Sequence, residues 1–301
     1  MMRRLLAIAA LAAPAAILTA CGERNDSRAA AADSAIVVFN AGSLARPMRA
    51  ALDSFAARRG LRVEQENAGS LETARKLTEL HHVPDVVALA DYEVFPQLLI
   101  PSQTTWFAEF ARNRMVLAYT DRSRFASEIG GANWFEILVR PGVETGRADP
   151  NRDPNGYRTL LVLQLAERFY GAPRLAARLF AAMPVRNMRS NEADLVGLLQ
   201  AGELDYIWSY ESLAQAAALR YVALPAEIDL SSPEKASIYA LASVRVNGAT
   251  PGDSITFRGT PILYALSIPA RAPHRARAES FVRWLLSADG VRVLRANKLD
   301  A

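Results

Sequence analysis

AIVVFNAGSL, residues 35–44, joins a continuous apolar run to a polar turn, and a helical pattern over residues 45–59 follows. Apolar, β-branched runs of this kind are typical of strands buried in a parallel sheet. The same order recurs in LRVEQENAGSL at residues 61–71, which leads into a second helical pattern through residue 80. VPDVVAL at residues 83–89 is a third strand. The succession β-α-β-α-β predicts a parallel sheet with right-handed crossovers.

Strands and helices continue to alternate along the rest of the chain. Strands are predicted over residues 115–119, 204–210 and 261–269, and helices over residues 157–170, 173–183, 194–201, 278–287 and 290–298. This order suggests a chain that leaves its first domain, builds a second one and returns. We therefore predict an α/β fold with two lobes, each a mostly parallel sheet flanked by helices. Lobe 1 takes residues 35–115 and 262–301, and lobe 2 takes residues 116–261; 301 residues suit two such domains.

The first residues have the layout of an export signal. Two arginines precede an apolar stretch over residues 5–18, and the tetrad LTAC follows at residues 18–21. We interpret residues 1–20 as a signal peptide. The tetrad resembles the lipobox of bacterial lipoproteins, in which Cys21 would carry the lipid and residues 21–34 would be a polar tether. The alternative is an ordinary signal peptide with an incidental cysteine.

The composition excludes several classes of function. The 35 Lys and Arg residues stand against 31 Asp and Glu residues and form no basic tract of the kind that binds nucleic acid. One cysteine permits neither an internal disulfide nor a Cys-x-x-Cys metal site. Of the three histidines two are adjacent and the third, His274, is remote, which is a poor basis for zinc or for a catalytic triad.

The clearest internal signal is the pentapeptide NAGSL, which occurs at residues 40–44 and 67–71. Each copy ends a predicted strand and opens a predicted helix. Gly42 and the second glycine permit a tight turn close to a ligand, and Ser43 and Ser70 are good N-cap residues. Because helix N-termini attract anions and neighbouring parallel strands end at one edge of a sheet, both turns are predicted to converge on one anion. The alternative is that both serines only cap their helices.

A second turn-rich element, ADPNRDPNG at residues 148–156, precedes the helix predicted from residue 157. Such a loop can present successive N–H groups to an anion. Asp153 either caps the following helix or lies at the anion, where it must be protonated or bonded to a metal centre to avoid repulsion. Arg147 and Arg158 flank the turn and are expected to form salt bridges with its aspartates.

Several motifs carry a resemblance to a known family. FNAGSL (39–44), ENAGSL (66–71), ALADY (88–92), FARNRMVLAYTD (110–121), NWFEILVRPGVETGRADPNRDPNGYRTL (133–160), LLQAGELDYIWSYES (198–212) and LRYVALP (219–225) resemble the molybdate/tungstate-binding proteins of the WtpA/ModA class, which serve ABC importers. The resemblance implies a type II periplasmic-binding-protein clamshell that encloses the oxyanion between its lobes.

The resemblance also implies ligand residues at Ser43, Ser70 and the turn Asp153-Pro154-Asn155, and a further ligand in the strand 204–210. Together with Gly42 of the first turn, and with Ser209 and Tyr210 of that strand, they form the predicted oxyanion site. Archaeal members often carry a glutamate where this chain has Ser209, and that glutamate and the aspartate complete a six-coordinate metal. Asp153 is thus a candidate direct ligand of molybdenum or tungsten. Glu211 either compensates for Ser209 or lies at the surface, and Tyr210 either donates to the anion or only packs.

The sequence therefore predicts a binding protein and not an enzyme. Its ligand would be molybdate or tungstate, its partners the permease and ATPase of an importer, and its location the extracytoplasmic side of a membrane to which Cys21 anchors it as a monomer. We expect a tetrahedral anion held mainly by hydrogen bonds. The alternatives are a binding protein for sulfate or phosphate, and a secreted hydrolase that uses Ser43 or Ser70.

Overall fold

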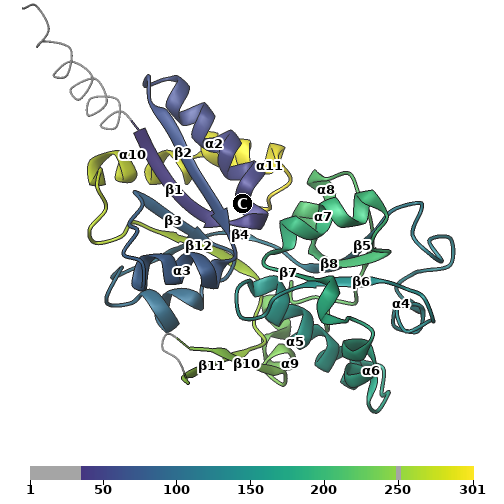
Figure 1. Ribbon diagram of the computed structural model, residues 1–301. Helices are drawn as coiled ribbons and strands as arrows, with labels where there is room; N and C mark the ends of the chain where they lie inside the picture. The colour runs from purple at the N-terminus through teal and green to yellow at the C-terminus, as the bar shows by residue number, and fades with distance from the viewer. Residues whose placement is uncertain (1–34, 249–251) are drawn as a thin grey trace, which may run out of the picture. The chain divides into compact units, whose positions relative to one another are not determined.

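The computed structural model describes residues 35–248 and 252–301 (Figure 1). The predicted signal peptide, the lipidation site at Cys21 and the tether lie outside the described residues. No helix within the described ranges is long and apolar enough to cross a membrane.

The chain builds two five-stranded sheets. The first sheet has the order β2-β1-β3-β12-β4, and its strands are β1 (Ala35–Ala41), β2 (Arg62–Ala68), β3 (Val86–Leu89), β4 (Ala108–Arg112) and β12 (Leu263–Ser267). The second has the order β7-β6-β8-β5-β9, and its strands are β5 (Met115–Tyr119), β6 (Thr145–Ala148), β7 (Met188–Arg189), β8 (Tyr206–Tyr210) and β9 (Arg220–Ala223). The chain passes from β4 to β5 and returns to β12 after β9.

The sheets are mostly parallel, as the sequence predicted, but each contains one strand, β12 or β5, that runs antiparallel to its neighbours. β1 pairs with β3 in parallel, and β6 pairs in parallel with β7 and β8. β12 runs antiparallel to both β3 and β4, and β5 runs antiparallel to both β8 and β9. β5 and β12 each follow a passage of the chain from one sheet to the other. No strand-helix-strand crossover sets the direction of these two strands.

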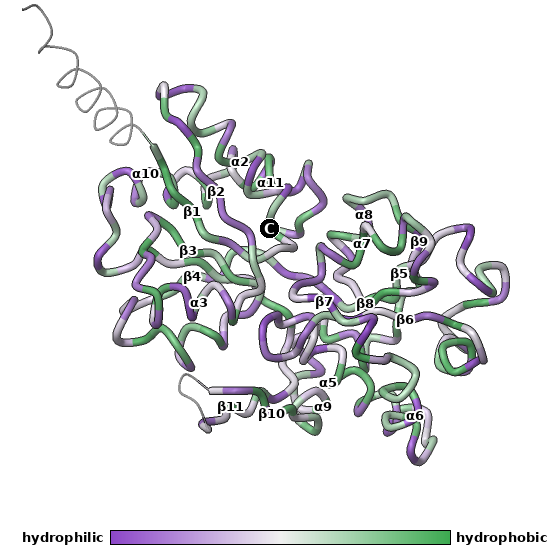
Figure 2. The backbone as a smooth tube through the Cα atoms, viewed as in Figure 1, coloured by the Kyte–Doolittle hydropathy of each residue, from purple (hydrophilic) through white to green (hydrophobic). Residues whose placement is uncertain are grey.

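Helices cover the sheets. Beside the first sheet lie the short 3₁₀ helix η1 (Gly42–Leu44), α2 (Ala45–Ala57), α3 (Ser70–Thr78), the π-helical turn η2 (Phe95–Leu99), α10 (Arg275–Leu285) and α11 (Ala288–Ala296). The ring of Phe55 on α2 packs edge-on against Phe281 on α10 at 5.2 Å between centroids. The C-terminal helices thus complete a core to which β1 and β3 contribute hydrophobic residues (Figure 2).

The remaining helices lie in sequence between the strands of the second sheet or after its last strand. They are α4 (Trp134–Ile137), α5 (Pro154–Phe169), α6 (Leu175–Ala181), η3 (Val185–Asn187), α7 (Glu192–Ala201), α8 (Glu211–Ala216), η4 (Pro233–Lys235) and α9 (Ala236–Tyr239). A hairpin of β10 (Ser243–Asn247) and β11 (Ser254–Arg258), which the sequence analysis missed, precedes the return to the first sheet.

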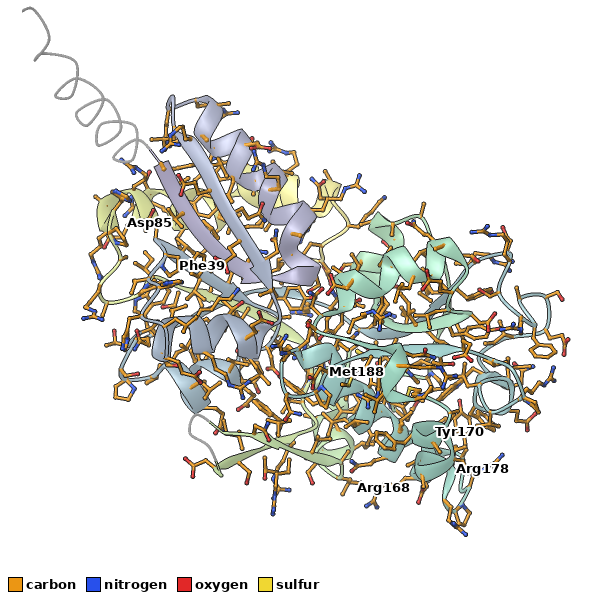
Figure 3. All side chains as sticks on the ribbon, viewed as in Figure 1. Phe39, Asp85, Arg168, Tyr170, Arg178 and Met188 are labelled. Carbon is orange, nitrogen blue, oxygen red and sulfur yellow. The ribbon has the colours of Figure 1, made fainter. Side chains whose placement is uncertain are left out.

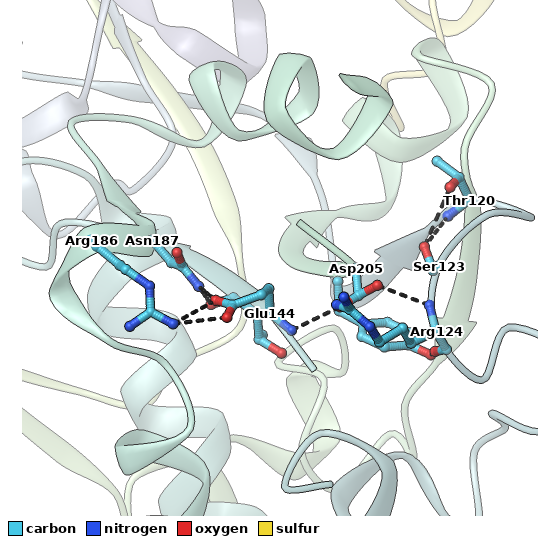
Figure 4. A network of polar contacts seen from close by, with 9 residues as sticks. Thr120, Ser123, Arg124, Glu144, Arg186, Asn187 and Asp205 are labelled. Atoms are coloured by element: carbon cyan, nitrogen blue, oxygen red, sulfur yellow. Dashed lines mark hydrogen bonds and ion pairs between the residues drawn. The ribbon is translucent and has the colours of Figure 1, made fainter. Parts of the chain in front are cut away.

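Buried aspartates hold each sheet to its surroundings. Asp85, just before β3, accepts hydrogen bonds from the backbone N–H groups of Val37 at 2.9 Å and His274 at 2.8 Å (Figure 3). In the second sheet, Asp205 accepts from the backbone of Glu144 at 2.8 Å and pairs with Arg124 at 2.7 Å (Figure 4). These contacts satisfy backbone N–H groups of β1 and of the neighbouring loops.

Candidate functional site

Ser43 and Ser70 are buried, but neither caps its helix. Gly69 is the N-cap of α3, and no side chain caps η1 or α3. Ser70 Oγ instead accepts a hydrogen bond from the backbone N–H of Ala90 at 3.0 Å, and Ser43 Oγ accepts from the hydroxyl of Tyr264 at 2.9 Å. The interpretation of the serines as helix caps is therefore wrong.

The direction of these hydrogen bonds leaves hydroxyl hydrogens free to donate. The hydroxyl of Tyr264 accepts a hydrogen bond from the side-chain amide of Asn113 at 3.0 Å and donates one to Ser43. The hydroxyl of Tyr210 accepts from Arg158 at 2.8 Å. A hydroxyl has one hydrogen and two lone pairs. Among residues 35–248 and 252–301, the hydroxyls of Ser43, Ser70 and Tyr210 each accept a hydrogen bond but donate none. The site therefore contains three buried hydroxyl donors without an acceptor from the described residues.

Arg158 of α5 joins the two sheets at this point. Its guanidinium donates to the carbonyl of Ala90 at 2.7 Å and lies 3.1 Å from the carboxylate of Asp91, while it also supports Tyr210. Burial would lower the pKa of Arg158, but Asp91 and the nearby tyrosines raise it above its ordinary value. The expected salt bridges of Arg147 and Arg158 with the turn aspartates do not form: Arg147 Nη1 contacts the carbonyl of Ala148 and the sulfur of Met188.

The turn before α5 brings Asp153 to the same region. Its Oδ1 accepts from the backbone of Asn155 at 2.8 Å, so it caps α5, while Oδ2 accepts from the backbone of Glu192 at 3.3 Å. Burial raises the pKa of Asp153 to about 6, against the lowering effect of these hydrogen bonds and of Arg158. Pro154 is the first residue of α5, and Asn155 donates to the carbonyl of Trp208 at 3.3 Å.

The hydroxyl of Ser209 is not free to donate to an anion. It donates to Glu192 Oε1 at 2.6 Å, and the same oxygen accepts from the backbone N–H of Tyr210 at 2.6 Å. Glu211 lies 3.2 Å from Arg114 and accepts from Tyr221, away from this cluster.

Glu192 is the residue that the sequence analysis missed. It is the first residue of α7, directly after the cap Asn191, and is 1% exposed. A carboxyl at the start of a predicted helix looks like an ordinary first-turn acid, so only its burial distinguishes it. In the described part of the chain, no group of three or more His, Cys, Asp or Glu side chains is placed to hold a metal ion. The carboxyl groups that act on Asp153 are those of Glu192 and Asp194.

The glycines of the two NAGSL turns permit close approach of side chains at the start of α7 and of main chain in the turn before α5. A Cβ added to Gly42 would lie 3.3 Å from Asn191 Oδ1, and one added to Gly69 would lie 2.3 Å from the carbonyl oxygen of Arg152. That carbonyl accepts from the backbone N–H groups of Leu71 at 3.0 Å and Glu72 at 3.2 Å. The start of α3 is thus capped by main chain from the turn before α5.

Replacing Gly69 with alanine is expected to destabilise the fold by about 1–3 kcal/mol, because the methyl group would overlap a backbone oxygen that cannot rotate away. Gly197 in α7 is the matched control, since an added Cβ there meets nothing within 4 Å and alanine favours helix. Urea unfolding of both variants measures the difference. Equal stability of the two variants would contradict the close approach at Gly69.

The predicted residues thus meet in one network. Ser43 reaches Tyr264, whose ring lies 5.9 Å from that of Tyr210, and Arg158 connects Tyr210 with Ala90, to which Ser70 is bonded. The chain passes between two sheets with flanking helices, and polar groups from the loops of both sheets form one network. This arrangement is that of the solute-binding proteins.

Comparison with known proteins places the chain within that class. Residues 36–297 match the family of bacterial extracellular solute-binding proteins, and the chain belongs to this family. It is 44% identical to an uncharacterized solute-binding protein of Petrotoga mobilis, over 87% of this chain and 82% of that protein. It is 35% identical to the molybdate/tungstate-binding protein WtpA of Thermococcus kodakarensis, over 89% of this chain and 82% of that protein. These relationships confirm the resemblance stated from the sequence motifs.

Solved structures confirm the predicted α/β fold. The periplasmic molybdate-binding protein of Azotobacter vinelandii has a TM-score of 0.64 at 15% identity, covering 88% of this chain and 99% of that one. The sulfate-binding protein SubI of Mycobacterium tuberculosis has a TM-score of 0.62 at 15% identity, covering 88% and 86%.

Proposed function

We propose that this protein binds molybdate or tungstate outside the cytoplasm and delivers the anion to the permease and ATPase of an ABC importer. The observation that carries the proposal is the set of three buried hydroxyls, Ser43, Ser70 and Tyr210, each of which accepts a hydrogen bond and keeps its own hydrogen to donate. A tetrahedral oxyanion has acceptors and no donors, so it matches such a set. The WtpA name of a relative that is 35% identical supports the choice of anion.

Neutral donors are sufficient for useful affinity. A hydrogen bond to a charged group contributes roughly 1.5–3 kcal/mol, and several of them in a buried site outweigh the ordering cost of binding. Rigid donors also favour molybdate and tungstate over the smaller sulfate. The anion stays tetrahedral in this proposal, and Asp153 holds α5 and α7 in place. The division into lobes at residues 115/116 and 261/262, the lipid anchor at Cys21 and the monomeric state belong to the same proposal.

Titration calorimetry with molybdate, tungstate, sulfate and phosphate tests the proposal directly. Molybdate and tungstate are expected to bind more tightly than sulfate or phosphate. Preferential binding of sulfate or phosphate would favour the alternative oxyanion, and absence of binding to all four anions would refute an oxyanion site. Absorption at the metal L-edge of the loaded protein is expected to report four-coordination.

Changing Ser43 or Ser70 to alanine is expected to weaken molybdate binding about tenfold each, because each change removes one charge-assisted donor. Ser237 is exposed on α9, and Ser237→Ala is the matched control with unchanged affinity. Calorimetry measures all three variants. Wild-type affinity in both Ser43→Ala and Ser70→Ala would remove the serines from the site.

Among the residues that the structure describes, neither Ser43 nor Ser70 hydrogen-bonds to a group that could act as a base for a hydrolase. The groups that contact Ser43 and Ser70 are the hydroxyl of Tyr264 and the amide of Ala90, whereas His274 bonds to Asp85. Activation of a serine nucleophile requires an adjacent proton acceptor. The family is one of binding proteins, and we propose that this member has no catalytic activity.

A further inference from the structure

Asn113 is a buried residue in the passage, residues 113–114, that leads from β4 to β5. Its backbone N–H donates to the carbonyl of Ile262, in the returning passage before β12, at 3.2 Å. Its side-chain amide contacts Ser212 of α8 at 2.7 Å and Tyr264 of β12 at 3.0 Å. A residue between the two sheets is thus bonded to elements that belong with each of them.

The backbone determines which end of the Asn113 amide faces which neighbour. Oδ1 accepts hydrogen bonds from the backbone N–H groups of Arg114 at 3.0 Å and Ser212 at 3.4 Å. A backbone N–H can only donate, so the oxygen of the amide must lie on that side. The nitrogen therefore lies at the other end, where it donates to the hydroxyls of Ser212 and Tyr264. Turning the amide around would place its N–H groups against two other donors.

The fixed amide sets the direction of the hydrogen bonds that follow it. An amide nitrogen has hydrogens and does not accept, so the oxygen of Tyr264 must accept from Asn113. The single hydrogen of Tyr264 is then left for its other neighbour, Ser43 Oγ, at 2.9 Å. Because Ser43 accepts this hydrogen, its own hydrogen points away from Tyr264. The three residues are 8%, 0% and 6% exposed, in the order Asn113, Tyr264 and Ser43, so bulk water does not compete for these bonds.

We propose that Asn113 is a positioning residue which, acting through Tyr264, turns the hydroxyl hydrogen of Ser43 towards the bound oxyanion. Asn113 does not contact the anion in this proposal, which rests on the proposed function.

The reverse direction of the chain would be unfavourable for binding. If Tyr264 donated to position 113, Ser43 would donate to Tyr264 and would present a lone pair to the anion. With Asn113 in place, the hydrogen of Ser43 is directed before the anion arrives, so binding does not include the cost of reorienting it.

A double-mutant cycle between Asn113→Asp and Ser43→Ala tests the proposal. Aspartate has nearly the same size, and one of its oxygens can still accept from the backbone of Arg114 and Ser212. The other oxygen accepts where the amide donated, so Tyr264 turns its hydrogen to it and then accepts from Ser43. Ser43→Ala is expected to weaken molybdate binding about tenfold in the wild type and less than about twofold in Asn113→Asp. Calorimetry with sodium molybdate at pH 8, where a carboxyl is ionised, measures the four proteins.

The cycle separates the direction of the hydrogen bonds from the added charge. Repulsion between the new carboxylate and the anion is present with and without Ser43→Ala, so it cancels in the comparison. Asn247→Asp, at an exposed position of β10, is the control, in which Ser43→Ala keeps its full tenfold effect. Asn113→Ala is a second variant should Asn113→Asp not fold. It leaves Tyr264 and Ser43 able to donate in either direction, so the effect of Ser43→Ala is expected to fall to about threefold.

Three results distinguish failure of the inference from failure of the proposed function. If Ser43→Ala weakens binding tenfold in the wild type and equally in the folded Asn113 variants, the direction of the Ser43 hydroxyl does not depend on Asn113 and the inference is overturned. Wild-type affinity in Ser43→Ala alone also overturns it, because Ser43 would then donate nothing to the anion. A wild type that binds no molybdate refutes the proposed function instead.

Discussion

Replacing Arg158 with leucine is expected to lower the free energy of unfolding by about 3–5 kcal/mol. The guanidinium and the carboxylate of Asp91 are 2% and 3% exposed and lie 3.1 Å apart. Removal of the cation leaves a buried carboxylate without compensation, which costs several kcal/mol. The same change removes the donor to the carbonyl of Ala90 and to the hydroxyl of Tyr210. Urea unfolding of the ligand-free protein measures the effect.

Two further variants distinguish loss of the pair from loss of packing. Arg168, on the same helix, is exposed (Figure 3), and Arg168→Leu is expected to change stability by less than about 1 kcal/mol. Combining Arg158→Leu with Asp91→Asn should restore part of the lost stability, because the uncompensated charge is gone. Strictly additive losses in the double variant would show that Asp91 and Arg158 act independently.

The second large effect is a loss of stability of the ligand-free protein as the pH rises from 4 to 7. The folded chain holds the proton of Asp153 up to a pKa of about 6, whereas the unfolded chain releases it near 3.8. Between these values the folded state binds more protons, so stability falls as pH increases. A difference of about two pKa units corresponds to about 3 kcal/mol, all of which is lost once the pH exceeds 6.

Asp153→Asn is expected to remove that part of the pH dependence, and asparagine remains a good N-cap for α5. Unfolding in urea at pH 4, 5, 6 and 7 compares the variant with the wild type. Asp149→Asn changes a half-buried carboxyl in the same turn and should retain the wild-type slope. Parallel curves for Asp153→Asn and the wild type would show that burial does not hold the proton on this carboxyl.

The sequence predicted best those elements whose buried residues form a recognisable pattern within one short stretch of sequence. The run MVLAY became β5 at the predicted residues 115–119, with every residue buried. The helix expected from residue 157 instead begins at Pro154, because proline is tolerated in the first turn and Asp153 caps it. The antiparallel direction of β12 could not be predicted, since PILYALSIP has the same apolar pattern in either direction.

The candidate site was only partly predictable, for a physical reason. A repeated turn marks Ser43 and Ser70 locally, but their partners, Tyr264 and the amide of Ala90, are brought to them by the fold. Arg158 pairs with Asp91, across 67 positions of sequence, in place of the turn aspartates beside it. Glu192 differs from an exposed helix-start acid only in what packs over it. Long-range pairing of polar groups leaves no periodic trace in a sequence.

The carbonyl of Arg152 caps α3 from outside its own sheet, and this has a consequence for how the protein tolerates change. Main-chain atoms make the tight contact of that junction, and the Arg152 side chain adds a hydrogen bond to Ser190 at 2.8 Å and lies 3.7 Å from Glu72 of α3. The residue opposite the carbonyl cannot vary, because glycine alone leaves room for a peptide group at that distance. Engineering of charge near the site should therefore leave position 69 untouched.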